Sequence, residues 1–261
     1  MPEGPEVKLC GERLASNISG QTLKYIEIIS GRYSKKTPGG IELFGKELPT
    51  TVVGPGVHGK FIYWIMKNNY FLYNTLGLTG AWSLEQGPYS RVKFSFENLD
   101  IFFDDKRNFG TLKFVKGKGN LLSKLQSLGP DMLSGDVEIS LFIDRLREKS
   151  SWEITKALMN QSVVAGIGNY IKSESLWKTK INPHSRVCDL DNDTLADLCV
   201  NIRDIMSDSY KSQKEGDNSF KLSVYSRKND PHDNEIIKEK TEDGRTTYWC
   251  PSVQHKGTIN E

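Results

Sequence analysis

A chain of 261 residues with 37% hydrophobic and 10% aromatic residues can bury two cores of ordinary size, which excludes a wholly disordered protein. Its formal net charge of +2 excludes a surface that is basic throughout, so a nucleic-acid surface would need local clusters of lysine. One such cluster comprises Lys113, Lys116, Lys118 and Lys124, and a solvated loop would explain these lysines equally well.

The chain opens with Met1-Pro2-Glu3-Gly4-Pro5-Glu6, a pattern that offers a nucleophile with acids beside it. If Met1 is removed, Pro2 has a free secondary amine, and an α-amino group titrates near pH ~8, so a useful fraction is unprotonated at neutral pH. Attack of this amine on an aldehyde-like carbon gives an iminium ion that acidifies the neighbouring carbon and favours β-elimination. A trimmed terminus without a chemical role is the alternative, so the motif needs support from elsewhere in the chain.

Residues 5–115 predict one helix followed by antiparallel strands. Apolar residues recur at helical spacing from Pro5 to Ile18, and Gly20 marks the end of the helix. The runs rich in β-branched and aromatic residues are Thr22–Ile29, Phe61–Met66, Tyr70–Tyr73, Val92–Phe96, Ile101–Phe103 and Thr111–Val115. Because no strand–helix–strand rhythm appears, we predict an antiparallel sandwich or barrel preceded by a helix.

After Gly129-Pro130 the pattern becomes helical. The segments with helical periodicity are Ile139–Lys149, Ser151–Met159, Asn169–Lys178 and Thr194–Lys211. The segment 150–153 has the capping-box form, and Asp193 is the predicted cap of the last helix. The fold class is therefore α+β, with a helical unit after the β domain.

Two short motifs in this second half favour binding. Gly166 and Gly168 precede a helix whose first N–H groups would form an anion site suited to a phosphate, although a packed helix–helix turn is the more common explanation. Further on, Glu235–Lys240 and Arg245–Cys250 flank a turn with the Asp-Gly pair that is typical of hairpins. This hairpin should project Arg245 beside its tip, and the polar chain from Pro251 onward should fray.

Six segments carry a resemblance to a known family. They are PEGPE at the start, HGK at His58–Lys60, LGLTG at Leu76–Gly80, DKRNFG at Asp105–Gly110, QSVVAGIGNYIKSESLW at Gln161–Trp177, and VYSR plus GRTTYWCP near the end. In this order they resemble the Fpg/Nei family of DNA glycosylases, over essentially the whole chain. The resemblance implies a catalytic β-sandwich domain over 1–120, a linker over 121–130, a helix–two-turn–helix domain over 131–222, a finger hairpin over 223–256 and a tail over 257–261.

The resemblance also implies a role for the N-terminal residues. Pro2 would attack the sugar carbon of a damaged nucleotide that has been turned out of the duplex. Glu3 would act as general acid and base on the sugar ring and the departing base, with Glu6 positioning the terminus. Lys60, Asn169 and Arg245 match the family's phosphate-binding residues, and we count Lys60 with the catalytic residues as well.

Three further residues match the positions that fill the gap left by the extruded base. These are Leu78, Arg107 and Phe109, and core packing is the alternative explanation for Leu78 and Phe109. Leu78 stands where many relatives have methionine, and Asn108 replaces a second arginine. The rule for the opposite base is therefore open.

The cysteines argue against a metal. Cys10, Cys188, Cys199 and Cys250 are widely separated and form no CxxC pair, so we expect free thiols in a reducing compartment. Relatives with a zinc finger carry two CxxC pairs around the hairpin, whereas this chain has residues 232–235 in place of the first pair. The second pair keeps Cys250 but has Val253 as its partner. His232, Glu235, Cys250 and His255 are poorly spaced for zinc, so we predict a zincless finger, no metal and no cofactor.

Two features bear on the substrate. Gly4 is the endonuclease VIII form of the motif, where the formamidopyrimidine branch usually has leucine, and the stretch Ser212–Lys221 leaves little room for the loop that covers oxidised purines in that branch. Both features favour oxidised pyrimidines, namely thymine glycol, 5-hydroxyuracil, 5-hydroxycytosine and hydantoins. Oxidised purines, 8-oxoguanine and formamidopyrimidine, are the alternative.

We therefore predict a bifunctional DNA glycosylase and class I AP lyase of base excision repair that cuts the strand by β- and δ-elimination. Its partner would be double-stranded DNA with oxidised bases or abasic sites, and it would act as a monomer. With no apolar run of about 18 residues and no signal-peptide pattern, we expect an intracellular protein without a membrane anchor. A catalytically silent binder of damaged DNA, as would follow if Met1 were retained, and an RNA-binding module are the competing hypotheses.

Overall fold

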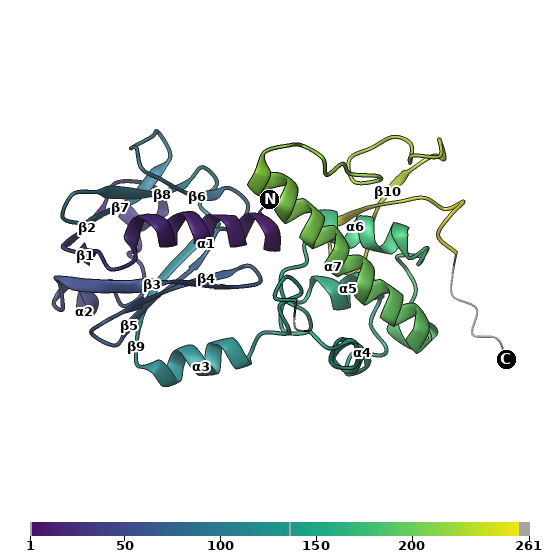
Figure 1. Cartoon of the computed structure of the whole chain (residues 1–261), viewed down its shortest axis with the longest axis horizontal. Helices are drawn as coiled ribbons and strands as arrows, with labels where there is room; N and C mark the ends of the chain where they lie inside the picture. Colours follow the sequence, from purple (N-terminus) through teal and green to yellow (C-terminus); the bar gives the residue numbers. More distant parts are fainter. Residues whose placement is uncertain (1, 136, 256–261) are drawn as a thin grey trace. The chain divides into compact units, whose positions relative to one another are not determined.

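The computed structural model describes residues 2–135 and 137–255, and it divides into two compact units. Unit 1 contains Pro2 and Glu6–Ser127, whereas unit 2 contains Glu3–Pro5 and the described residues from Leu128 onward. Figure 1 shows the chain and labels helices and strands in each unit. Within the described ranges, no helix is both long and apolar enough to cross a bilayer.

Helix α1 (Gly4–Ile18) confirms the helix predicted at the start of the chain. Its apolar stripe includes Val7, Leu14 and Ile18, which are buried in the core of unit 1. Gly20 follows at a φ of 78°, a left-handed conformation that glycine adopts without strain and that ends the helix.

Unit 1 is built on two antiparallel sheets. The five-stranded sheet has the order β1 (Thr22–Leu23), β3 (Thr50–His58), β4 (Phe61–Met66), β5 (Tyr70–Thr75) and β9 (Thr111–Lys116). The four-stranded sheet has the order β2 (Tyr25–Ile28), β7 (Ser90–Ser95), β8 (Asp100–Asp105) and β6 (Gly80–Ser83). The predicted run Thr22–Ile29 is thus divided between the two sheets.

Aromatic side chains join the two sheets. The ring of Trp64 on β4 lies 5.2 Å from that of Phe94 on β7 and 4.9 Å from that of Trp82 on β6, measured between centroids. Strand β7 buries alternate residues, because successive side chains of a strand point to opposite faces. The antiparallel sandwich predicted from the sequence is confirmed.

The sequence patterns missed two strands of this sandwich. Strand β3 contains Gly54, Pro55 and Gly56, which suggest a loop. Its neighbour β1 pairs only with Thr50 and Thr51, so on that side Pro55 lies at a free sheet edge, where a residue without an N–H is tolerated. Strand β6 is four residues long and begins with a glycine, so it has no alternation to detect.

The lysine cluster lies on regular structure rather than on a loop. Lys113 and Lys116 are on β9, and Lys118 and Lys124 are on helix α3 (Lys118–Gln126). Lys116 pairs with Glu47 at 2.9 Å between Nζ and Oε1. Helix α3 covers part of residues 121–130, where the sequence predicts a linker. Two smaller helical elements, η1 (Gly31–Ser34) and α2 (Ile41–Gly45), were also not predicted.

Unit 2 contains the four predicted helices. They are α4 (Ile139–Arg147), α5 (Ile154–Met159), α6 (Asn169–Lys178) and α7 (Asn192–Glu215), with the short helix η2 (Val187–Asp189) between the last two. Helix α6 is the most enclosed, since its residues from Ile171 to Leu176 are all buried. Strands β10 (Ile237–Lys240) and β11 (Thr246–Trp249) form the predicted hairpin.

Both predicted helix caps in unit 2 are wrong. The N-cap of α7 is Asp191, whose carboxylate accepts the N–H of Thr194 at 2.7 Å, whereas Asp193 lies in the first turn. Either aspartate would suit the cap, and the earlier one prevails because the helix begins at Asn192. The segment 150–153 forms no capping box, because α5 begins at Ile154 and its N-cap, Glu153, makes no capping hydrogen bond.

Candidate active site

Glu3 and Gly4 of the N-terminal motif contact the start of helix α6 and the turn before it. Glu3 is only 2% exposed, and its Oε1 and Oε2 accept the N–H groups of Tyr170 at 2.9 Å and of Ile171 at 3.2 Å. The N–H of Gly4 donates to the carbonyl oxygen of Gly166 at 2.9 Å. Pro2, the residue before Glu3, is partly exposed, as is Glu6.

This contact corrects the prediction of a phosphate site at the start of α6. The first N–H groups of a helix attract an anion, but two of those in α6 already bind the carboxylate of Glu3. Two of the N–H groups that the sequence pattern offered to a phosphate therefore bind the carboxylate of Glu3 instead. The arrangement fixes a buried carboxylate next to the residue whose amine is the predicted nucleophile.

Glycines make this close contact possible. A Cβ added at Gly168 would lie 2.2 Å from Cδ of Glu3, so no other residue fits there unless Glu3 moves. A Cβ at Gly4 would lie 2.5 Å from Cε of Met206 and 3.2 Å from the carbonyl oxygen of Gly166. Gly4 is therefore explained by packing against α7, which weakens its value as a marker of substrate.

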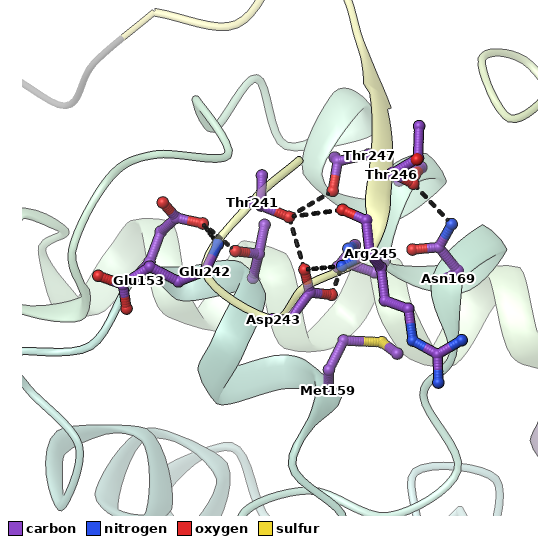
Figure 2. A network of polar contacts seen from close by, with 12 residues as sticks. Glu153, Met159, Asn169, Thr241, Glu242, Asp243, Arg245, Thr246 and Thr247 are labelled. Atoms are coloured by element: carbon purple, nitrogen blue, oxygen red, sulfur yellow. Dashed lines mark hydrogen bonds and ion pairs between the residues drawn. The ribbon is translucent and has the colours of Figure 1, made fainter. Parts of the chain in front are cut away.

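Asn169 and Arg245 come together in unit 2, as Figure 2 shows. The side-chain Nδ2 of Asn169, the first residue of α6, donates to the carbonyl oxygen of Thr246 at 2.8 Å. Thr246 directly follows Arg245, which is exposed and whose guanidinium extends away from the hairpin turn in Figure 2. A buried amide and an exposed guanidinium are thus tied to the same stretch of backbone.

Lys60 lies in the tight turn between β3 and β4 of unit 1, directly after Gly59. Gly59 has a φ of 56°, a left-handed conformation that allows the turn, and Lys60 is partly buried there.

The three residues predicted to fill the gap left by the extruded base come from two neighbouring loops of unit 1. Leu78 is in the turn between β5 and β6, whereas Arg107 and Phe109 follow β8. A Cβ at Gly77 would lie 2.7 Å from the carbonyl carbon of Phe109, so the two loops touch. Phe109 is 53% exposed, which excludes the core-packing explanation for that residue, and Leu78 is half-buried. The guanidinium carbon of Arg107 lies 5.1 Å from the centroid of the Phe109 ring.

A buried aspartate that the sequence analysis did not select holds these loops in place. Asp105 is 1% exposed; its Oδ1 accepts the hydroxyl of Thr79 at 2.6 Å and its Oδ2 accepts the N–H of Gly110 at 2.6 Å. The hydroxyl oxygen of Thr79 in turn accepts the N–H of Arg107 at 2.9 Å. A carboxylate at the end of a strand, directly before a loop rich in cations, is the signal that could have identified Asp105.

Glu174 is a second residue that sequence reasoning missed. Its carboxylate accepts the main-chain N–H groups of Ser223, Val224 and Tyr225 at 2.8–2.9 Å. This contact ties the VYSR segment to α6 and explains why an acidic side chain is buried in that helix.

Three protein-family models match the chain in order, and the second and third overlap. Formamidopyrimidine-DNA glycosylase N-terminal domain matches residues 1–112, the H2TH domain of the same enzyme matches residues 128–221, and its C-terminal domain matches residues 212–255. The chain belongs to the Fpg/Nei family of DNA glycosylases. It is therefore a DNA glycosylase with the AP lyase activity that this family shares.

Individual members of the family are similar to the chain over its whole length. The formamidopyrimidine-DNA glycosylase of Lactiplantibacillus plantarum is 28% identical over 97% of this chain and 99% of its own, and that of Oceanobacillus iheyensis is 29% identical over 97% and 98%. The structure of Lactococcus lactis Fpg bound to DNA with an AP site has a TM-score of 0.86 at 27% identity, covering 97% of this chain and 100% of its own. A structure of MutM with DNA containing carbocyclic 8-oxo-G has a TM-score of 0.83 at 26% identity, covering 98% and 100%.

The hairpin of this Fpg/Nei member does not fit the zinc ion that the family pattern implies. His232, Glu235 and His255 are exposed, whereas Cys250 is buried and its sulfur lies 3.1 Å from the hydroxyl oxygen of Ser252. Among residues 2–135 and 137–255, no three histidine, cysteine or acidic side chains are grouped so that they could hold a metal ion. The four cysteines are free thiols.

Hydrogen bonds hold the segments before and after the hairpin in place. The carboxylate of Asp230 accepts the N–H groups of His232 and Asn234, both at 2.9 Å, and the indole N–H of Trp177 at 3.2 Å. Burial alone would raise the pKa of Asp230, but the hydrogen bonds together outweigh it and lower the pKa. On the other side, the side chain of Gln254 accepts the N–H of Cys250 and donates to the carbonyl oxygen of Ile181, both at 2.8 Å.

Proposed function

We propose that the protein removes oxidised bases from double-stranded DNA and cuts the strand at the abasic site that results. The observation that carries this proposal is that Glu3, the residue after Pro2 in the chain, is buried and its carboxylate is fixed by two main-chain N–H groups. A rigid acid next to an amine nucleophile is the arrangement that imine chemistry needs. The relatives whose structures contain DNA with an AP site or 8-oxo-G support the choice of substrate.

In the proposed reaction, the amine of Pro2, freed by removal of Met1, attacks C1′ of the damaged nucleotide. The bond from C1′ to the base breaks, and the base leaves with a proton. The C1′–O4′ bond of the sugar ring then opens, O4′ takes a proton, and an iminium ion forms between Pro2 and C1′. Loss of a proton from C2′ then expels the 3′ phosphate, and a second elimination expels the 5′ phosphate. Glu3 transfers protons at the sugar ring and the base, and Glu6 positions the terminus.

The remaining site residues would bind and open the DNA. Lys60, Asn169 and Arg245 would contact phosphates of the damaged strand, since phosphate contacts fix position without reading sequence. Leu78, Arg107 and Phe109 would fill the gap in the duplex, which offsets part of the cost of unstacking the flipped base. The exposed ring of Phe109, in a loop braced by Asp105, suits such an insertion.

For the lesion itself we propose ring-opened and oxidised purines first. The relatives over the whole length of the chain are formamidopyrimidine-DNA glycosylases, and their similarity outweighs Gly4, which packing against Met206 explains. Oxidised pyrimidines remain the second candidate, because the stretch Ser212–Lys221 is too short for a loop that covers an oxidised purine. Helix α7 extends to Glu215, and the segment from Gly216 is tied back to it by Ser212, whose hydroxyl binds Asp217 at 2.8 Å.

Excision rates on matched duplexes will separate the two candidates. We expect single-turnover release of formamidopyrimidine-guanine and 8-oxoguanine to be faster than release of thymine glycol, by about tenfold or more, a difference of about 1.4 kcal/mol in transition-state binding. Faster release of thymine glycol would instead assign the enzyme to oxidised pyrimidines.

Borohydride trapping tests the proposed nucleophile. Reduction during turnover should give a covalent protein–DNA complex linked through the N-terminal peptide, because borohydride converts the iminium ion to a stable amine. A form that retains Met1 should give little or none, since its Pro2 nitrogen is an amide, whereas Pro2→Gly keeps an α-amine and retains some trapping. No complex from any form, on damaged or abasic DNA, would leave a silent DNA binder.

A further inference from the structure

An ion pair is buried beneath the hairpin turn of unit 2. Lys172 on α6 has a side chain that is 0% exposed, and its Nζ lies 2.6 Å from Oδ2 of Asp243, whose side chain is 3% exposed. By contrast, Lys178 on the same helix pairs with Asp204 at 3.4 Å, and these two side chains are 44% and 53% exposed.

A contribution to the unfolding free energy does not explain why this ion pair is buried. Burial lowers the pKa of Lys172 below its usual value, even though the attraction of Asp243 acts in the opposite direction. The charge of Lys172 is therefore costly to bury even with Asp243 beside it. Hydrophobic side chains of similar size would serve stability at least as well, so the pair needs another explanation.

Asp243 provides that explanation through its second oxygen. Its Oδ1 accepts the hydroxyl of Thr241 at 2.6 Å and the main-chain N–H of Arg245 at 3.1 Å. The N–H of Thr241 donates to the carbonyl oxygen of Arg245 at 3.2 Å, and the hydroxyl of Thr241 lies 2.8 Å from that of Thr247. Both main-chain groups of Arg245 are thus held by the turn, while its guanidinium extends away (Figure 2).

Helix α6 makes side-chain hydrogen bonds to the hairpin on both sides of Arg245. Asn169 and Lys172 are three residues apart, so they lie on the same face of the helix. Asn169 binds the carbonyl oxygen of Thr246, directly after Arg245, and Lys172 binds Asp243, two residues before it.

We propose that Lys172 and Asp243 are positioning residues for Arg245: their ion pair fixes the hairpin turn on α6, so that Arg245 is presented to a DNA phosphate without a metal ion. The proposal rests on the phosphate-binding role proposed above for Arg245. It assigns to these two side chains the task that a metal would perform in a zinc finger.

The test uses Lys172→Met combined with Asp243→Leu, which replaces the pair by apolar side chains. We expect this double variant to melt near the temperature of the wild-type protein, because removal of the two buried charges offsets the loss of the acceptor for Thr241 and Arg245. Lys172→Met alone should melt lower, because it leaves the charge of Asp243 buried and unpaired. Affinity for a duplex with a tetrahydrofuran abasic analogue should fall about tenfold in the double variant. The slope of log K against log salt should become less steep by about 0.9, the value for one lost phosphate contact.

Two comparisons connect the loss of affinity to Arg245. Arg245→Ala should give the same change in salt slope, and adding it to the double variant should cause no further loss, because the effects of residues that act through one contact are not additive. Lys178→Met, on the same helix, is the control that should bind like the wild-type protein.

Each other outcome refutes a specific claim. A double variant that binds as the wild-type protein does while Arg245→Ala binds weakly would overturn the positioning role and leave the proposed function intact. Additive losses, or a double variant that does not fold, would also overturn it. Wild-type affinity and salt slope for Arg245→Ala would instead refute the phosphate-binding role of Arg245 itself.

Discussion

Glu3→Gln will lower the rate of base excision by about 10²–10⁴-fold, the usual contribution of a general acid or base. Glutamine has the shape of glutamate, so the protein should remain folded. It cannot exchange a proton with the sugar or the departing base. One of the two N–H groups, of Tyr170 or Ile171, would also face the amide NH₂ instead of an acceptor, at a cost of about 1–3 kcal/mol in unfolding free energy.

Base excision and strand cleavage should respond differently to this substitution. Strand cleavage at a preformed abasic site should fall less than excision, because no base has to leave, and both rates can be measured on one duplex series. Glu12→Gln, a change of the same kind within α1, is the matched control and should excise at the wild-type rate. An unchanged rate of excision in Glu3→Gln would exclude Glu3 from proton transfer.

Local patterns sufficed for much of the fold. Helix α6 and strand β4 have the predicted bounds, because a helix start after two glycines and a continuous run of apolar and aromatic residues are both encoded within a few residues. Strand β3 was missed because its Gly-Pro-Gly segment has the composition of a loop. Its pairing with β4 makes it a strand, and the free edge on the other side tolerates Pro55. The cap of α7 was misplaced by two residues because Asp191 and Asp193 suit it equally well.

In the candidate site, local sequence patterns could not predict the contacts between residues that are far apart in the chain. The resemblance selected Glu3 and Asn169, but no spacing in the sequence indicates that the carboxylate of Glu3 would occupy the start of α6, 167 residues away from it at Tyr170. The contact between Lys172 and Asp243 spans 71 residues, and each side chain alone suggests a solvated surface. Such pairs follow from the packing of a hairpin on a helix, which periodicity does not describe.

Gly168→Ala is expected to cost about 1–3 kcal/mol of unfolding free energy and to lower excision roughly 100-fold. The backbone at Gly168, with φ −126° and ψ −160°, is open to alanine, so the effect comes from the added methyl group alone. Its carbon would lie 2.2 Å from Cδ and 2.5 Å from Cγ of Glu3. Glu3 has to leave the N–H groups of α6, and its carboxylate no longer has a fixed place beside Pro2.

Comparison with two other variants isolates this displacement of Glu3. Gly119→Ala, in the exposed part of α3, has no heavy atom within 4 Å of the new Cβ and should raise stability by up to about 1 kcal/mol through helix propensity. Gly168→Ala combined with Glu3→Gln should excise no more slowly than Glu3→Gln alone, because both changes act on one carboxylate. If the two losses multiply instead, Gly168 affects the reaction by a route other than Glu3, and the fixed carboxylate is not what the glycine protects.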